Sequence, residues 1–195
     1  HELLKNPDIA GVFCVSTSYR NEPNPINGRH HKIFPMFEFE SHGDIDDMIS
    51  IEKELLDHLG FSSPKNLEYE EACKWYNVDT IEIKQEEEMA DHYGNVVSLQ
   101  YFPERTHPFW NMKQNEQDKN LFHKVDVIMY GQETIGSAER SCDAKEMQDN
   151  FLSISDGEYA DLLFEQFTKD RVMKELDDFL NQDFFPRFGG GIGVA

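Results

Sequence analysis

Hydrophobic and polar positions alternate near the N-terminus, and this pattern predicts a β-hairpin. Residues 11–17 are mostly β-branched and aromatic, which is typical of a buried strand. Residues 23–28 are rich in Pro, Asn and Gly and predict a turn. Successive side chains of the returning strand point to opposite sides of a sheet. We expect one side to face a core; it carries Ile33, Phe37 and Phe39. We expect the other side to face a ligand; it carries Phe34, Met36, Glu38 and Glu40.

The pattern further along the chain predicts a mixture of helices and strands. Apolar residues recur at helical spacing over residues 45–59 and Gly60 ends the run, so we expect this helix to pack on the sheet. The other expected elements are a helix at 68–76, a strand at 79–83, a charged helical segment around 86–88, a strand at 96–102 and one helical stretch at 158–180.

The composition is that of a folded domain. The chain has 195 residues, of which 38% are hydrophobic, with 15 Phe, 7 Tyr and 2 Trp, which suits one domain with a sizeable core. No apolar run approaches the roughly 20 residues that cross a membrane, and no secretory signal pattern is present.

Charge and cysteine content narrow the range of partners. The formal net charge of −20 should repel phosphate backbones, so any nucleic acid must be held by another domain or by a small basic patch. Cys14, Cys73 and Cys142 are far apart and form no C-x-x-C pair. This indicates packing residues with reduced thiols in the cytoplasm and argues against a zinc site.

Two acidic residues within residues 125–140 indicate a site for a divalent cation. Apolar residues alternate around Asp126, and a short turn leads to a second strand that carries Glu133. If Met129 and Tyr130 are central in the turn, the two acids become cross-strand neighbours with Cβ atoms about 4.5–5.5 Å apart. Such carboxylates repel each other unless a cation joins them, and Mg²⁺ bound by carboxylates and substrate phosphates is a common solution. A structural ion pair is the alternative.

Residues 18–40 resemble motif 2 of the class II aminoacyl-tRNA synthetases, in the branch for aspartate, asparagine and lysine. The pattern is R-N-E, a polar loop, R-H-x-x-x-F and then M-x-E. Ile33, where this branch usually has glutamate, and a slightly long loop depart from it. The matching residues are Arg20, Glu22, Arg29, His30, Phe34 and Glu38.

Three later segments resemble the same branch. Residues 125–140 match an upstream D followed by G-x-E-[IL]-x-x-G-x-x-R, with Ser137 in place of a glycine and Arg140 as the final arginine. Residues 109–113 are similar to the F-Y-M-K segment of asparaginyl enzymes with one extra residue, although Trp110 is as readily a core residue. Residues 188–195 resemble the start of motif 3, G-[GF]-G-[IL]-G-x-x-R.

The resemblance implies an α+β fold, an antiparallel sheet flanked by helices, with residues 1–195 as a single catalytic-core domain. It also implies a ligase that forms an aminoacyl-adenylate from ATP and an amino acid, with Mg²⁺. Arg20 would be the catalytic residue, because its planar fork can span the carboxylate and the α-phosphate. The other implied roles are ATP contacts by Glu22, Arg29, His30, Phe34, Gly191 and Gly193, Mg²⁺ ligation by Asp126 and Glu133, and amino-acid contacts by Glu38, Glu40 and Arg140.

The amino acid and its acceptor remain open. The arginine matching Arg140 pairs with the side-chain carboxylate in aspartyl enzymes, but Glu139, where relatives often have glutamine, leaves aspartate and asparagine unresolved. One function is a homodimeric synthetase core that holds tRNA through parts outside this chain. A second is a tRNA-independent paralogue that makes asparagine from aspartyl-adenylate and ammonia, and a third is a non-catalytic relative. We expect both ends to be cut, because His1 reads as mid-helix and Ala195 directly follows a glycine-rich strand.

Overall fold

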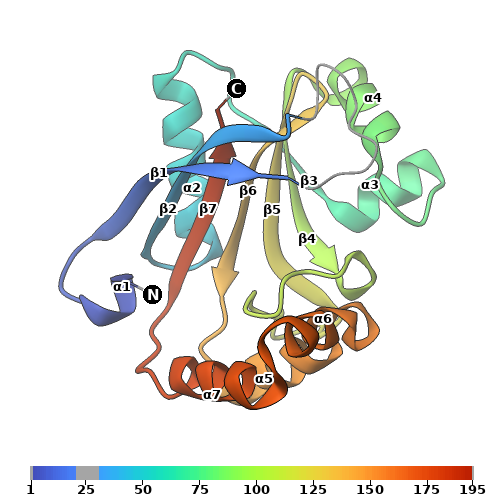
Figure 1. Ribbon diagram of the computed structural model, residues 1–195. Coiled ribbons are helices and arrows are strands. Elements are labelled where there is room, and N and C mark those ends of the chain that lie inside the picture. The colour runs from blue at the N-terminus through green and yellow to red at the C-terminus, as the bar shows by residue number, and fades with distance from the viewer. Residues whose placement is uncertain (1, 21–30, 195) are drawn as a thin grey trace.

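Seven strands form one sheet in the order β1-β2-β7-β6-β5-β4-β3 in the computed structural model, which describes residues 2–20 and 31–194 (Figure 1). The β3–β4 pair is parallel and the other pairs are antiparallel. The strands are β1 (Gly11–Tyr19), β2 (Ile33–His42), β3 (Lys65–Glu68), β4 (Val96–Pro103), β5 (Leu121–Met129), β6 (Gln132–Arg140) and β7 (Arg187–Gly193). The helices are α1 (Glu2–Lys5), α2 (Ile45–His58), α3 (Tyr69–Tyr76), α4 (Ile83–Tyr93), α5 (Ala144–Ser153), α6 (Glu158–Phe167) and α7 (Lys169–Leu180). The expected α+β fold with an antiparallel sheet is confirmed.

Helix α2 packs on one face of the sheet, which we call the α2 face (Figure 1). Asp44 caps the helix, because its Oδ1 accepts hydrogen bonds from the backbone N–H groups of Asp46 at 3.0 Å and Asp47 at 3.2 Å. The apolar stripe then meets the central strands: Met48 packs with Val125, and Leu56 with Val127. The predicted helix and its packing are therefore confirmed.

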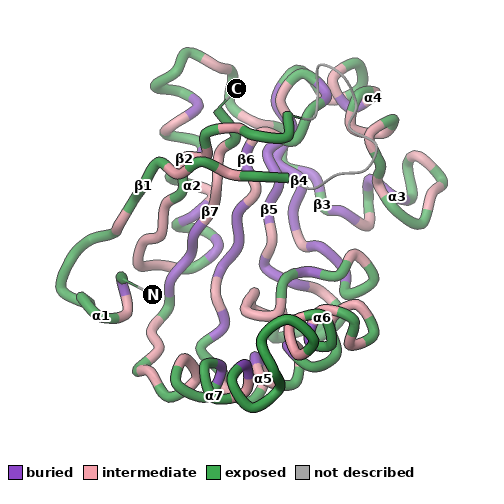
Figure 2. Tube along the Cα trace, in the orientation of Figure 1, coloured by how far each residue is buried: buried purple, intermediate pink, exposed green. Residues whose placement is uncertain are grey.

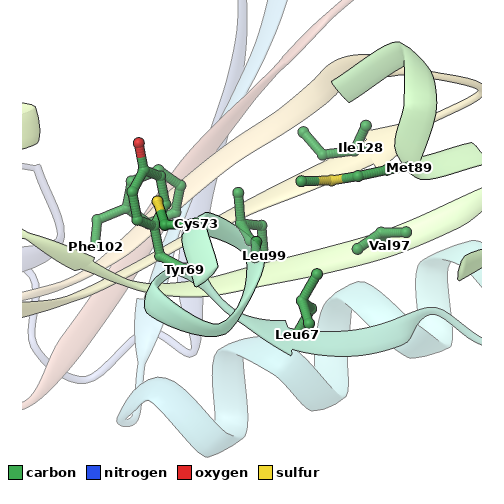
Figure 3. Close-up of a cluster of buried hydrophobic side chains, with 9 residues drawn as sticks. Leu67, Tyr69, Cys73, Met89, Val97, Leu99, Phe102 and Ile128 are labelled. Carbon is green, nitrogen blue, oxygen red and sulfur yellow. The ribbon is translucent and has the colours of Figure 1, made fainter. Parts of the chain in front are cut away.

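Helices α3 and α4 cover the β3–β4 side of the other face, which we call the opposite face (Figure 3). Tyr69 of α3 and Met89 of α4 are almost fully buried against Leu99 and Ile128. The rest of the opposite face, over β2, β7, β6 and β5, carries the polar side chains of the candidate site.

The edge strand β1 has no buried residue (Figure 2), so the expectation of a buried strand at residues 11–17 is wrong. Phe39 packs into the α2 core and Phe37 stacks on Phe13 with ring centroids 5.7 Å apart. Ile33, in contrast, is 61% exposed and Phe13 is 74% exposed. The expectation that Ile33 faces a core is wrong for the described chain, because α2 packs over β5, β6 and β7 and not over the outer end of the hairpin.

The expected strand at residues 79–83 is wrong. Residues 79–82 lie outside any strand and α4 begins at Ile83. The side chain of Gln85 accepts a hydrogen bond from the backbone N–H of Glu82 at 3.1 Å, so a capping box starts the helix here. Alternation over five residues was therefore not enough to distinguish a strand from a loop that leads into a helix.

The single helical stretch expected at residues 158–180 is two helices. Thr168 has a φ of 69° and separates α6 from α7. Apolar residues of both helices pack in one cluster, namely Tyr159, Leu163, Met173, Leu176 and Leu180, whereas Leu162 is 53% exposed. Trp110 packs edge-on against Phe151 and Phe179, so its interpretation as a core residue is confirmed.

The three cysteines are all free, as expected, but only Cys73 is a packing residue. Cys14 and Cys142 are exposed, which corrects their interpretation as packing residues. Among the helices of residues 2–20 and 31–194, none is both long and apolar enough to span a bilayer.

Candidate active site

The strand register places a strip of small residues on the opposite face, with charged side chains on both sides. One row across the sheet runs from Glu38 on β2 through Gly191 and Gly136 to Asp126 on β5. The strands are about 4.8 Å apart, so the two carboxylate-bearing positions at the ends of this row are about 14 Å apart. The neighbouring row is Glu40, Gly189, Ala138 and Lys124. These rows form a floor without large side chains.

Asp126 and Glu133 converge over Gly136. A Cβ added to Gly136 would lie 2.9 Å from Glu133 Oε1 and 3.6 Å from Asp126 Oδ1. The turn that joins their strands is centred on Tyr130 and Gly131, which have φ values of 51° and 80°. The predicted turn was therefore wrong by one residue.

The two acids also fail to pair directly across the strands. Asp126 pairs with Gly136 and Glu133 pairs with Ile128, because the register shifts between Val127 and Ile128. This bulge returns Glu133 to the same face as Asp126. The two carboxylates therefore share a face because of the bulge, and not because they are direct cross-strand partners as the sequence predicted.

These two carboxylates fit a divalent cation. Asp126 Oδ1 is buried and has no hydrogen-bond partner within the described residues. Burial and the charge of Asp126 raise the pKa of Glu133 above its ordinary value, and burial likewise raises the pKa of Asp126. Within the same residues, no group of three or more His, Cys, Asp or Glu side chains is placed to bind a metal. Any metal site within these residues would therefore consist of the two carboxylates, with oxygens from water or substrate as the remaining ligands.

Arg20 and Phe34 lie together at the hairpin end of this face. The Arg20 guanidinium carbon is 5.3 Å from the centroid of the Phe34 ring, and the Arg20 charge acts on Glu133. The backbone N–H of Arg20 donates to the carbonyl of Lys32 at 2.8 Å, which holds the two strands together at this point. Three further predicted ATP contacts, Glu22, Arg29 and His30, lie outside the described residues.

Arg140 and Arg187 face each other across β6 and β7 at the other end of the floor. Arg187 is 2% exposed and its Nε donates to Glu40 Oε1 at 3.0 Å. Burial lowers the pKa of Arg140, and the nearby Arg187 also lowers it, against the opposing effect of Glu40. No hydrogen bond or ion pair joins the Arg140 guanidinium to residues 2–20 and 31–194. This end of the site therefore holds an excess of positive charge that is partly shielded from water.

The remaining predicted contacts lie on the same face. Glu38 accepts hydrogen bonds from Ser16 Oγ at 2.7 Å and Cys14 Sγ at 3.7 Å, so the edge strand orients it. A Cβ at Gly191 would lie 3.1 Å from Met36 Sδ, whereas a Cβ at Gly193 would meet nothing within 4 Å. The floor is open at Gly193.

Ser137 and Glu139 point to the α2 face and do not line the site. Ser137 Oγ donates to Glu52 Oε1 at 2.5 Å, which explains how a side chain is accommodated where relatives have glycine. Glu139 accepts from Lys113 Nζ at 2.9 Å and lies 2.6 Å from His123 Nδ1. Glu139 therefore points away from the candidate site, and its contacts do not help to choose between aspartate and asparagine.

Glu52 is expected to make the stability of the protein depend on pH. Burial raises its pKa to about 7 from 4.5. The folded state therefore binds the Glu52 proton more tightly than the unfolded state does, and this difference stabilises the fold. The stabilisation is fully present below about pH 4.5 and is lost as the pH rises through about 7. Gln mimics the protonated acid, so Glu52→Gln should make the protein about 2 kcal/mol more stable than the parent at about pH 8.5. Urea unfolding at acidic and alkaline pH measures this difference.

The matched control is Glu54→Gln, which makes the same chemical change on an exposed residue of α2. It should leave the pH dependence as it is. Equal pH dependence in Glu52→Gln and the parent would show that Glu52 is not the buried acid responsible.

Sequence reasoning missed several residues that build the site. Lys124 and Arg187 contact the predicted residues Asp126 and Glu40 directly. Lys124 was accessible to the same reasoning, because it lies two residues before Asp126 and so shares its face. Arg187 had no such signal, since its partner Glu40 is distant in the sequence.

Comparison with known proteins places this arrangement in a family. A computed family model for class II tRNA synthetases (D, K and N) matches residues 2–194, and the chain belongs to this family. Solved structures with similar folds include the aspartyl-tRNA synthetase of Entamoeba histolytica, with a TM-score of 0.74 at 20% identity, covering 98% of this chain and 45% of that one.

A second similar structure is the asparaginyl-tRNA synthetase of Pyrococcus horikoshii, solved in complex with asparaginyl-adenylate. The TM-score is 0.77 at 17% identity, and the match covers 98% of this chain and 49% of that chain. This chain thus spans about half the length of these structures. No curated protein matched it.

Proposed function

We propose that this chain is the catalytic core of a synthetase of the aspartyl/asparaginyl type that activates an amino acid with ATP. The observation that carries the proposal is the sharing of one face of the sheet by Arg20, the Asp126–Glu133 pair and Arg140. The family and the fold support it further.

The reaction joins two anions, so the site must neutralise charge and fix geometry. An oxygen of the amino-acid carboxylate attacks the α-phosphorus of ATP, the bond to the bridging oxygen breaks, and pyrophosphate leaves. Arg20 binds the carboxylate and the α-phosphate together through its fork of N–H donors. The ring of Phe34 stacks on adenine. Asp126 and Glu133 would hold Mg²⁺, and the bound cation would supply positive charge that offsets the charge of the phosphates.

Aspartate fits the far end of the floor better than asparagine. The half-buried Arg140 lacks a hydrogen bond or an ion pair within the described residues, while Arg187 is already bonded to Glu40. An unpaired charge that is partly removed from water is costly, and a side-chain carboxylate would compensate it, whereas a carboxamide would bring no charge. We therefore favour aspartate.

The experiment that tests this function is exchange of labelled pyrophosphate into ATP. The protein should catalyse the exchange with Mg²⁺ and aspartate and far more slowly with asparagine, since a site for a charged partner discriminates by factors that reach about 10⁴. No exchange above background with either amino acid would contradict the proposal and favour a non-catalytic relative.

The acceptor of the activated amino acid distinguishes two candidates. The first is tRNA, bound mainly through parts outside this chain. The second is ammonia, which would convert aspartyl-adenylate to free asparagine; the net charge of −20 favours it, because it disfavours a large phosphate-backbone contact. Incubation with labelled aspartate, tRNA and ammonium separates them, since the label ends either on tRNA or in asparagine.

We also propose that the active form is a cytoplasmic homodimer. The outer hairpin presents Phe13, Val15, Tyr19 and Ile33, each more than 60% exposed, on the α2 face, and a second copy would cover this apolar surface. Phe13→Glu should convert a dimer to a monomer in sedimentation experiments. Sedimentation of the parent protein as a monomer would contradict the proposal.

A further inference from the structure

Lys124 is bonded to one of the two proposed metal ligands. Its Nζ lies 2.6 Å from Asp126 Oδ2 and 3.8 Å from the centroid of the Phe102 ring. The Asp126 side chain is 7% exposed and that of Lys124 is 23% exposed. A charge-assisted hydrogen bond this short and this shielded from water is stronger than a surface ion pair.

The two oxygens of Asp126 therefore have different surroundings. Oδ2 is bonded to Lys124, whereas Oδ1 is buried without a partner within the described residues and points over Gly136 towards Glu133. A cation between Asp126 and Glu133 would lie close to the Lys124 ammonium, and two positive charges a few ångströms apart repel each other strongly in a partly buried site.

We propose that Lys124 is an internal competitor of the divalent cation at Asp126. Lys124 balances the Asp126 charge when no cation is bound, and it must leave Asp126 when a cation binds. Its flexible four-carbon stem allows this movement. The row that Lys124 shares with Ala138 and Gly189 on the opposite face then gives its ammonium access to an anionic substrate. This inference rests on the proposed metal site.

The direct test is binding of Mn²⁺, a hard cation that prefers the same oxygen ligands as Mg²⁺. Free Mn²⁺ is measured by electron paramagnetic resonance with the protein at about pH 8, without ATP or amino acid. Lys124→Met removes the competitor and should bind Mn²⁺ at least about fivefold more tightly than the parent, in line with the loss of one charge-assisted hydrogen bond. Lys124→Arg keeps the charge and should bind about as weakly as the parent.

Lys53→Met is the matched control. Lys53 also lies 2.6 Å from a carboxylate, Asp57 Oδ2, but on the exposed side of α2, so this variant makes the same charge change away from the site. It should leave Mn²⁺ affinity unchanged. An equal gain in both variants would indicate a general effect of net charge and would overturn the proposal.

Thermal melting gives a second readout that does not depend on activity. Lys124→Met leaves the buried Asp126 without its counter-charge, so the variant should melt at a lower temperature than the parent without metal and regain more of that loss with Mn²⁺. Unchanged or weaker Mn²⁺ binding in folded Lys124→Met would overturn the competitor role.

Asp126→Asn separates this inference from the proposed metal site. Loss of Mn²⁺ binding in Asp126→Asn, with no gain in Lys124→Met, would keep the metal site and reject the competitor. Equal Mn²⁺ binding by Asp126→Asn and the parent, or no binding by the parent and by Lys124→Met, would reject both.

Discussion

Arg20→Ala is expected to lower aspartate-dependent pyrophosphate exchange by about a thousandfold, the upper range for removing one preorganised donor to a developing charge. The fork of Arg20 is the group that draws the substrate carboxylate and the α-phosphate together. Its side chain is exposed beside Phe34, so its removal should change the unfolding free energy by less than about 0.5 kcal/mol. Exchange kinetics and urea unfolding on the same preparation measure both effects.

Two further variants make the Arg20 result specific. Arg20→Lys keeps the charge but not the bidentate fork, and should recover only part of the rate. Arg171→Ala removes an exposed arginine that is paired with Glu175 on α7, away from the floor, and should exchange at the parent rate. Full exchange activity in Arg20→Ala would remove Arg20 from the catalytic site.

Arg140→Leu should produce the second largest effect, a rise of roughly a hundredfold or more in the aspartate concentration needed for half-maximal exchange. The reason is loss of the only partner that we assign to the aspartate side chain, while ATP affinity should stay close to that of the parent. Exchange at varied aspartate, together with calorimetric titration of ATP, measures the two quantities.

The stability of Arg140→Leu provides an independent check. Arg140 is a half-buried cation beside Arg187, and its guanidinium has no hydrogen bond within residues 2–20 and 31–194. Replacing such a charge with an apolar side chain of similar reach should leave stability unchanged or increase it. A variant that loses both ATP binding and stability would instead assign Arg140 a structural role.

Sequence patterns predicted which residues share the face of the proposed site, but not how these residues are arranged on it. Strand alternation placed Phe34, Glu38 and Glu40 on one side of β2, and the register confirms that side as the one bearing Gly191. The sequence also predicted that Asp126 and Glu133 lie close together, but it placed the turn between their strands one residue too early. A β-bulge shifts the register by one residue, and neither strand pattern nor motif spacing showed that Glu133 would return to the face of Asp126 in this way.

The exposure of residues at the sheet edge, and the contacts between residues far apart in the chain, could not be predicted from the sequence. Ile33 follows the apolar alternation, but its exposure depends on where α2 ends its packing. Arg187 bonds to Glu40 across the sheet, and Ser137 was read only as a missing glycine although Glu52 is its partner. Each of these contacts joins residues that are distant along the chain, and their proximity is a property of the assembled sheet.

The most direct test of the account is a crystal structure with a non-hydrolysable sulfamoyl analogue of aspartyl-adenylate. The analogue should lie over Gly191, Gly136 and Gly189, with adenine on Phe34, the sulfamoyl group on Arg20 and the aspartyl carboxylate on Arg140. An analogue bound elsewhere, or with its side chain away from Arg140, would contradict the assignment of this face as the active site.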